Sequence, residues 1–152
     1  MIAMITWMVP AVAQPTDDEA KIRALENQFV AAVNAKDLDA IMKVYMPDET
    51  LLVFDVVPPR QYVGAKAYRE DWEDFLALFE ITDLQITPPT RSATVTPSSV
   101  SAVPKTKGWP IDLTVRPTDV CRKINGNWLI VHEHVSVPVD LNTNKPDLAS
   151  KP

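Results

Sequence analysis

Cysteine and histidine are scarce in this chain, and positive charge is not concentrated anywhere along it. The 152 residues include one cysteine, Cys121, which cannot form an internal disulfide and therefore leaves the redox compartment open. Its place in a predicted strand favours a packed thiol over a nucleophile. A net charge of −5 without a lysine or arginine cluster argues against nucleic acid and against an anionic membrane surface. We therefore expect no nucleic acid and no membrane among the partners.

An apolar run at residues 1–13 precedes the first helical pattern and ends in Ala-Val-Ala. It is similar to the end of a secretory signal, but it lacks a positively charged start and is too short to span a bilayer. We interpret residues 1–15 as a truncated export signal or as a disordered extension. The first alternative implies a periplasmic or secreted protein, and the second a cytoplasmic one. Residues 16–140 form the predicted domain, and residues 141–152 a C-terminal tail.

Hydrophobic periodicity predicts three helices followed by a strand-rich half. The first helix starts at acidic residues 17–19, the second has Asp37 as its N-cap, and the third follows Gly64. The apolar stripes are Ile22, Leu25, Phe29 and Val33 in the first helix and Tyr68, Trp72, Phe75 and Phe79 in the third. Strands are predicted at residues 50–56, 61–63, 81–86 and 111–124, the last interrupted by Pro117 at an edge or a bulge. This order predicts an α+β fold in which helices pack on one face of a curved antiparallel sheet.

Residues 88–110 do not fit this pattern. They are rich in proline, serine and threonine, and only residues 93–96 have strand character. A structureless connection of this length is uncommon inside a compact domain. The segment is therefore either a mobile surface loop or a strand that the sheet requires and the sequence supplies poorly.

The strongest hairpin signal is Asn125-Gly126, because both central residues of a type I′ turn need a positive φ. The residue pairs that this turn would oppose are Trp128 and Lys123, Ile130 and Cys121, His132 and Asp119, and His134 and Pro117. Strand alternation then puts His132, His134 and Asp119 on one face with several apolar side chains. The opposite face would carry Leu129, Val131, Glu133, Val135 and Val137. We interpret the face with the histidines as the wall of a pocket.

Three stretches resemble a known superfamily. They are residues 29–39, the turn at 61–64 that leads into a helix, and residues 125–136. They are similar to the nuclear-transport-factor-two-like (NTF2-like) superfamily, and most of all to its SnoaL-like and ketosteroid-isomerase-homologue branch. The resemblance implies a cystatin-like, cone-shaped α+β fold with three helices, in which a bent mixed sheet wraps an N-terminal helix. It also implies a pocket at the open end and a homodimer through the outer sheet face.

The superfamily hosts isomerases, cyclases, hydrolases and non-catalytic subunits, so the fold alone does not give the function. Ketosteroid isomerases have a tyrosine oxyanion donor at the position of Phe29, which has no hydroxyl. Their general-base aspartate falls on Val53, and Asp55 lies two residues further along. Asp119 matches their second oxyanion-hole position, where the family uses a protonated aspartate. Steroid isomerisation by that mechanism is therefore not what the sequence favours.

Asp119, His132 and Asp55 are the candidate catalytic residues. Asp119 could fix the tautomer of His132, whose free nitrogen would then transfer protons, and Asp55 could act as an acid or base if burial raises its pKa. Alternatively, His132 and Asp119 form a structural cross-strand hydrogen bond. The His-x-His pair could also bind a metal with Asp119 or Asp55 as third ligand, but we expect no metal because the superfamily rarely uses one. Nothing marks a nucleotide, haem or flavin site, so we expect no cofactor.

The candidate ligand-binding residues are Phe29, Phe54, Arg60, Tyr62, Trp72, His134 and Ser136. Of these, Arg60 could clamp a carboxylate or phosphate bidentately or could be a solvated loop residue, and His134 and Ser136 are placed at the pocket mouth. Two functions follow. The protein is a non-catalytic module that holds a small organic molecule in an apolar pocket, or it is an isomerase, cyclase or lyase that transfers protons next to a carbonyl.

Overall fold

The computed structural model describes residues 17–86 and 98–148. The predicted extension at residues 1–15 and the strand-like stretch at 93–96 lie outside this range. The helices are α1 (Asp17–Ala35), α2 (Leu38–Met42) and α3 (Ala65–Leu78). The strands are β1 (Leu52–Phe54), β2 (Tyr62–Val63), β3 (Phe79–Ile86), β4 (Ser98–Pro104), β5 (Ile111–Ile124), β6 (Asn127–Ser136), β7 (Val139–Asp140) and β8 (Lys145–Pro146).

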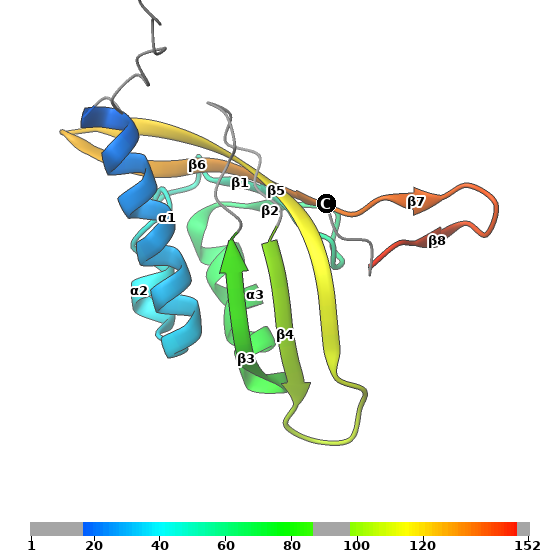
Figure 1. The fold of residues 1–152 in the computed structure, drawn as a ribbon. Helices are drawn as coiled ribbons and strands as arrows, with labels where there is room; N and C mark the ends of the chain where they lie inside the picture. Colours follow the sequence, from blue (N-terminus) through cyan, green and yellow to red (C-terminus); the bar gives the residue numbers. More distant parts are fainter. Residues whose placement is uncertain (1–16, 87–97, 149–152) are drawn as a thin grey trace, which may run out of the picture.

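The main sheet of the described chain has six strands in the order β2-β1-β6-β5-β4-β3. It is mixed, because β1 runs parallel to β6 while the other pairs are antiparallel. Strand β5 bends along its length, so that β6 and the β3–β4 pair belong to differently oriented halves of the sheet (Figure 1). Helices α1 and α3 lie on the inner side of this bend (Figure 1). The predicted α+β architecture with three helices is confirmed.

The helices form where the sequence supplies their caps and apolar stripes. Asp37 caps α2 by accepting a hydrogen bond from the backbone N–H of Ala40 at 3.0 Å. Asn34 fastens α1 to the sheet, because its amide donates to the Leu84 carbonyl at 3.1 Å and accepts from the Leu84 N–H at 2.9 Å. The core between helices and sheet includes Val33, Ile41, Tyr45, Leu51, Val53 and Tyr68, all at most 2% exposed. In the described residues, no helix is long and apolar enough to cross a membrane.

Strand β4 confirms, from Ser98 onwards, the second of the two alternatives for residues 88–110, a strand that the sheet requires. This strand pairs with β3 on one side and with β5 on the other. Its inward residues Ser98 and Ala102 are buried, and Val100 lies between them on the same face. The strand is regular despite its low β propensity because both neighbours supply hydrogen-bond partners. The registered pairs between β4 and β5 end at Val115, so Pro117 lies beyond the paired part of β4.

The register of the β5–β6 hairpin is predicted correctly only near the turn. Asn125 and Gly126 have the expected positive φ values of 50° and 87°. Residues Lys123 and Cys121 pair with Trp128 and Ile130 as expected, but the register then shifts by one residue. The irregularity lies between Cys121 and Val120, and it leaves Val131 as an extra residue in β6. Beyond this bulge the observed pairs are Val120 with His132, Asp119 with Glu133, Thr118 with His134 and Pro117 with Val135.

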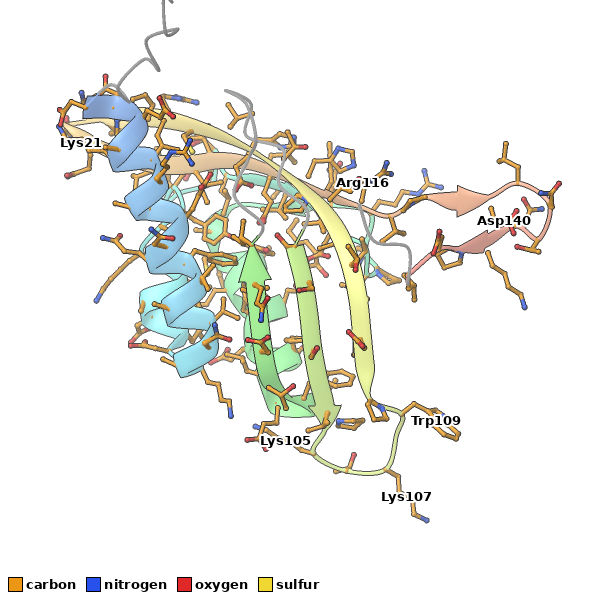
Figure 2. The ribbon with its side chains drawn as sticks, viewed as in Figure 1. Lys21, Lys105, Lys107, Trp109, Arg116 and Asp140 are labelled. Atoms are coloured by element: carbon orange, nitrogen blue, oxygen red, sulfur yellow. The ribbon has the colours of Figure 1, made fainter. Side chains whose placement is uncertain are left out.

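Two features project from the body of the molecule. Residues 139–146 form the β7–β8 hairpin, which projects away from the main sheet and carries Asp140 (Figure 2). Trp109 lies in the loop between β4 and β5 and is 90% exposed (Figure 2). Neither feature reaches the interior between the helices and the sheet.

Candidate functional site

A cavity of about 200 Å³ lies between the helices and the inner face of the sheet. Apolar and aromatic side chains form most of its wall: Phe29, Val33, Val56, Val57, Trp72, Phe75, Ile81, Leu84, Ile86, Val100, Ile111, Leu113, Val115, Pro117, Ile130 and Val135. The remaining lining residues are polar or carry an ionisable group: Glu26, Asp55, Tyr68, Asp71, Ser98, Asp119 and Glu133. A benzene-sized molecule fills an engineered apolar cavity of about 150 Å³. The present cavity is therefore large enough for an aromatic ring with a short substituent.

Glu133 is the most enclosed carboxyl group of the cavity wall. It is 5% exposed and accepts hydrogen bonds from the hydroxyls of Tyr45 and Tyr68 at 2.9 and 3.0 Å. The two tyrosine rings meet edge to face at a centroid distance of 5.1 Å, so they hold both hydroxyls on the same carboxylate oxygen. Burial raises the pKa of Glu133 to about 8, and the neighbouring Asp119 carboxyl adds to this increase. Burial and the Glu133 charge also raise the pKa values of both tyrosines.

Asp119 lies directly opposite Glu133 across the β5–β6 pair. Burial raises its pKa to about 7, and the carboxylate of Glu26 on α1 contributes in the same direction. Asp55 follows β1, and burial raises its pKa as well. Carboxyl groups that share an apolar cavity resist simultaneous ionisation, because each negative charge makes the next one less favourable. The site therefore holds carboxyl groups that retain protons at pH values where an exposed carboxyl has lost its proton.

Three buried polar atoms of the described chain have no hydrogen-bond partner: the indole Nε1 of Trp72, the hydroxyl of Ser98 and Oδ1 of Asp119. All three residues line the cavity. A buried polar atom without a partner costs about 1–3 kcal/mol of stability, so such atoms are rare in folded proteins. Their concentration around one cavity indicates that it is built to receive a molecule that supplies the missing hydrogen bonds.

The expected pair of His132 and Asp119 is not formed, because the bulge at Val131 turns His132 to the other face of the sheet. His132 pairs with Val120, and its Nδ1 lies 2.8 Å from the Leu52 carbonyl oxygen. Glu133 takes the inward place opposite Asp119. The predicted face was therefore wrong for His132, His134 and Glu133. It was right for Asp119, and the roles of Asp119 and Asp55 stay predictions.

The candidate ligand-binding residues divide in the same way. Phe29 and Trp72 line the cavity. The other five do not line it in the described structure: Phe54, Arg60, Tyr62, His134 and Ser136. Phe54 contacts His132 and His134 on the outer face, with ring centroids 5.2 and 5.7 Å apart. Arg60 and His134 are exposed, and the Ser136 hydroxyl donates to the Arg116 carbonyl at 3.3 Å. Tyr62 is buried and donates to Asp71 at 2.6 Å, so it supports a lining residue from behind.

Sequence reasoning missed Glu133, Glu26, Asp71, Ser98 and the hydroxyl groups of Tyr45 and Tyr68. A signal existed for Asp71, which is three residues after Tyr68 and four before Phe75 and therefore lies along their helical stripe. Glu26 has the same signal in α1, because it is four residues after Ile22 and three before Phe29. Glu133 has none. Glu133 reaches the cavity only because of the bulge, and nothing in an apolar strand sequence marks the position of such an extra residue.

The sequence model of the SnoaL-like domain family matches residues 22–140. The chain belongs to the SnoaL-like family. An NTF2-like protein of unknown function from Pseudomonas putida KT2440 is 26% identical, with a TM-score of 0.66 over 92% of this chain and 100% of the other. A ketosteroid isomerase-like protein from Erwinia carotovora atroseptica SCRI1043 is 16% identical, with a TM-score of 0.63 over 78% of this chain and 95% of the other. No curated protein is significantly similar.

A third similar structure is described by a different activity. A putative SnoaL-like polyketide cyclase from Mesorhizobium loti is 15% identical, with a TM-score of 0.56 over 76% of this chain and 97% of the other. At this identity the likeness shows the fold alone. The SnoaL-like match and the NTF2-like protein from Pseudomonas putida place the chain in the NTF2-like superfamily. The chemistry of its cavity has to be argued from its own residues.

The buried carboxyl groups predict that this SnoaL-like protein loses stability as the pH rises. Their pKa values in the folded protein, about 7 for Asp119 and about 8 for Glu133, exceed the ordinary values of 3.8 and 4.5. Between these limits the folded state holds protons that the unfolded state has released, so the free energy of unfolding falls with increasing pH. Urea unfolding at pH 5, 6, 7 and 8 should show this decrease. Its size follows from about 1.4 kcal/mol for each unit of pKa difference.

In Glu133→Gln, the free energy of unfolding should fall less steeply with increasing pH, and it should be higher than in the wild type at pH 8. Glutamine keeps an acceptor oxygen for Tyr45 and Tyr68 and resembles the protonated carboxyl, but it does not titrate. Glu73→Gln removes the same charge from the exposed side of α3. Its free energy of unfolding should change with pH as steeply as that of the wild type. Equal slopes for Glu133→Gln and the wild type would show that the Glu133 carboxyl is ionised throughout this pH range.

Proposed function

We propose that this SnoaL-like protein binds a small, mostly apolar organic molecule in the cavity between the helices and the sheet. The observation that carries the proposal is the set of three unpartnered polar atoms, on Trp72, Ser98 and Asp119, around an otherwise apolar wall. Concave sites with apolar walls and a few convergent polar groups are typical of small-molecule binding. A ligand would bury its apolar surface against the wall and would satisfy the polar atoms at the same time.

We propose proton transfer next to a carbonyl as the second candidate function. The observation that favours it is the pair Asp55 and Asp119, two carboxyl groups that line the same cavity with raised pKa values. A carboxyl group with a pKa near the working pH transfers protons efficiently in either direction. Asp55 would take the proton from carbon, and a protonated Asp119 would donate a hydrogen bond to the carbonyl oxygen. The structurally similar proteins described as isomerase-like and cyclase-like are compatible with this chemistry.

We also propose that the protein forms a homodimer through the outer face of its sheet. The register places five partly or largely exposed side chains on that face: Phe54, Val63, Val120, His132 and His134. Val63 and Val120 are 56% and 48% exposed, which is high for β-branched residues within a sheet. Burial of this patch against a second copy would remove apolar surface from water.

The binding function predicts that filling the cavity abolishes ligand binding. Indole, which is neutral at pH 7, should bind to the wild-type protein and shift the NMR signals of the Leu113 and Val115 methyl groups, which line the cavity and are present in every variant. Val100→Trp should abolish these shifts, because the larger side chain occupies the space of the ligand. Val103→Trp is the matched control, since Val103 lies on the same strand but points to the opposite face and is 37% exposed. Equal binding by Val100→Trp and Val103→Trp would overturn the proposed binding site.

The proton-transfer function predicts exchange of carbon-bound hydrogen. The protein should accelerate the replacement of α-hydrogens of 1-indanone by deuterium in D₂O, as followed by NMR. Asp55→Asn should reduce the accelerated rate by about 100-fold or more, which is the usual contribution of a general base. His132→Asn is the control and should keep the accelerated rate, because His132 lies on the outer face of the sheet and does not line the cavity. Exchange no faster than in buffer alone would leave the binding function without a catalytic one.

The dimer predicts that a charge on the outer face separates the subunits. Val120→Glu would place two carboxylates in the proposed interface without hydrogen-bond partners, which is strongly unfavourable. Light scattering after size-exclusion chromatography should give twice the chain mass for the wild type and the single chain mass for this variant. Leu78→Glu, at an exposed position of α3, should remain dimeric. A monomeric wild-type protein at micromolar concentration would refute the proposed interface.

A further inference from the structure

We propose that the cavity takes an organic amine as its ammonium ion, with Asp119 as the counter-ion. This inference rests on the proposed binding function and names the class of ligand. Five carboxyl groups line the cavity, on Glu26, Asp55, Asp71, Asp119 and Glu133. In the described parts of the chain, no lysine, arginine or histidine lines it.

The charge of the cavity wall selects against anions. Each of the five acids comes from a different part of the fold: α1, the segment after β1, α3, β5 and β6. A bound carboxylate or phosphate would meet negative charge on several sides of a poorly solvated space, where charge interactions are stronger than in water. The chain as a whole carries a net charge of −5, which also attracts cations. A bound cation would offset the charge of one ionised acid and so weaken the repulsion among the carboxylates.

The hydrogen bonds of the acids identify the counter-ion. Glu133 accepts from two tyrosine hydroxyls, Asp71 accepts from the Tyr62 hydroxyl, and Asp55 accepts from the backbone N–H of Val56. By contrast, Oδ1 of Asp119 is buried without a partner among the described residues. Ammonium groups donate three hydrogen bonds and accept none, so they match an unpaired carboxylate oxygen. Glu26 is only half-buried, so water can reach it, and Asp119 is therefore the lining acid with a buried oxygen that has no partner among the described residues.

Ser98 provides an independent indication that a ligand belongs here. This residue is 4% exposed, lines the cavity on β4, and has a hydroxyl without a partner in the described structure. The indole Nε1 of Trp72 is also unpaired and can only donate. An ammonium group cannot satisfy Trp72, because it has no acceptor. The ligand should therefore carry an oxygen acceptor in addition to its amine.

The aromatic side chains of the wall suit the same ligand. Trp72 meets Phe29 and Phe75 edge to face, with centroid distances of 6.0 Å in both pairs. Edge-to-face packing leaves ring faces available to the cavity, and ring faces attract cations as well as apolar groups. The acids are also too dispersed for a metal ion, since no three histidine, cysteine, aspartate or glutamate side chains of the described chain form a metal-binding group. An organic cation of molecular size can reach Asp119 and the aromatic wall together.

Four probes with closely related skeletons test the inference by isothermal titration calorimetry at pH 7.5. Tyramine carries the amine and a phenol oxygen, 2-phenylethylamine lacks the oxygen, 4-(2-hydroxyethyl)phenol replaces the amine with a hydroxyl, and 4-hydroxyphenylacetate carries a negative charge. Tyramine should bind about tenfold or more tightly than 4-(2-hydroxyethyl)phenol, because only tyramine pairs with a buried carboxylate. 2-Phenylethylamine should bind more weakly than tyramine, and 4-hydroxyphenylacetate should be the weakest ligand.

Asp119→Asn should remove the preference for tyramine over 4-(2-hydroxyethyl)phenol, because the asparagine keeps the shape but not the charge. Glu73→Gln removes the same charge outside the cavity and should keep the preference. Circular dichroism shows whether each variant is folded. The pH dependence of the wild-type protein gives a second readout that needs no variant.

In the wild type, the preference for tyramine should increase from pH 5 to pH 8 and binding should release a proton, because the Asp119 carboxyl has a pKa of about 7 before it meets the cation. The ionisable groups that face Asp119 are Glu133, Glu26 and Cys121. Two further groups belong to this set: the Arg23 charge lowers the pKa of Glu26, and the Asp119 charge raises the pKa of Tyr45. Aliphatic amines stay protonated throughout this range. Equal affinities for tyramine and the alcohol would overturn the inference and leave the binding function intact. Binding of none of the four probes would overturn both.

Discussion

One extra residue in β6 decides which side chains reach the cavity. Because side chains of a strand alternate between faces, an insertion at Val131 exchanges the faces of every residue that follows it. Without the bulge, His132 would face Asp119, and Glu133 would lie on the outer surface. With it, a carboxyl group faces a carboxyl group inside the cavity, and both histidines lie outside with Phe54. The bulge therefore adds Glu133 to the acids of the interior and puts both histidines beside Phe54 on the outer face.

The fold has to stabilise an acid that the bulge turns inward. Two tyrosines from different elements do so, since Tyr45 follows α2 and Tyr68 lies in α3 and both donate to Glu133. The same rings belong to the hydrophobic core, where they are at most 2% exposed. A packed aromatic ring with a hydroxyl at its tip therefore serves two purposes here: it fills the core and satisfies a buried carboxyl. Asp119 has no such partner for Oδ1 and is left available to a ligand.

The sequence predicts the helices, strands and turns of this fold better than its site. The reason is that the former depend on residues close in sequence, whereas the site depends on contacts between distant segments. Helical stripes such as Leu25 to Val33, the cap at Asp37 and the turn at Asn125-Gly126 depend on residues close in sequence, and the structure confirms them. Strand β4 was underestimated because its pairing with β3 and β5 is a tertiary effect that local propensity does not contain. The bulge is tertiary in the same sense. A register prediction that is correct at Cys121 becomes wrong at Asp119 within two residues.

The apolar residues of the cavity wall follow from the fold, whereas its carboxyl groups do not. Phe29 and Trp72 line the cavity because the apolar stripes of α1 and α3 face the interior, and their role in ligand binding stays a prediction. The carboxyl groups follow no such rule. They reach the cavity from five different segments. Burial, together with the charge of neighbouring acids, raises the pKa values of Asp119 and Glu133 above their ordinary values of 3.8 and 4.5. Such an arrangement costs stability in the free protein, and a bound cation would recover part of that cost. A bound cation therefore gives a physical reason for several acids to share one apolar cavity.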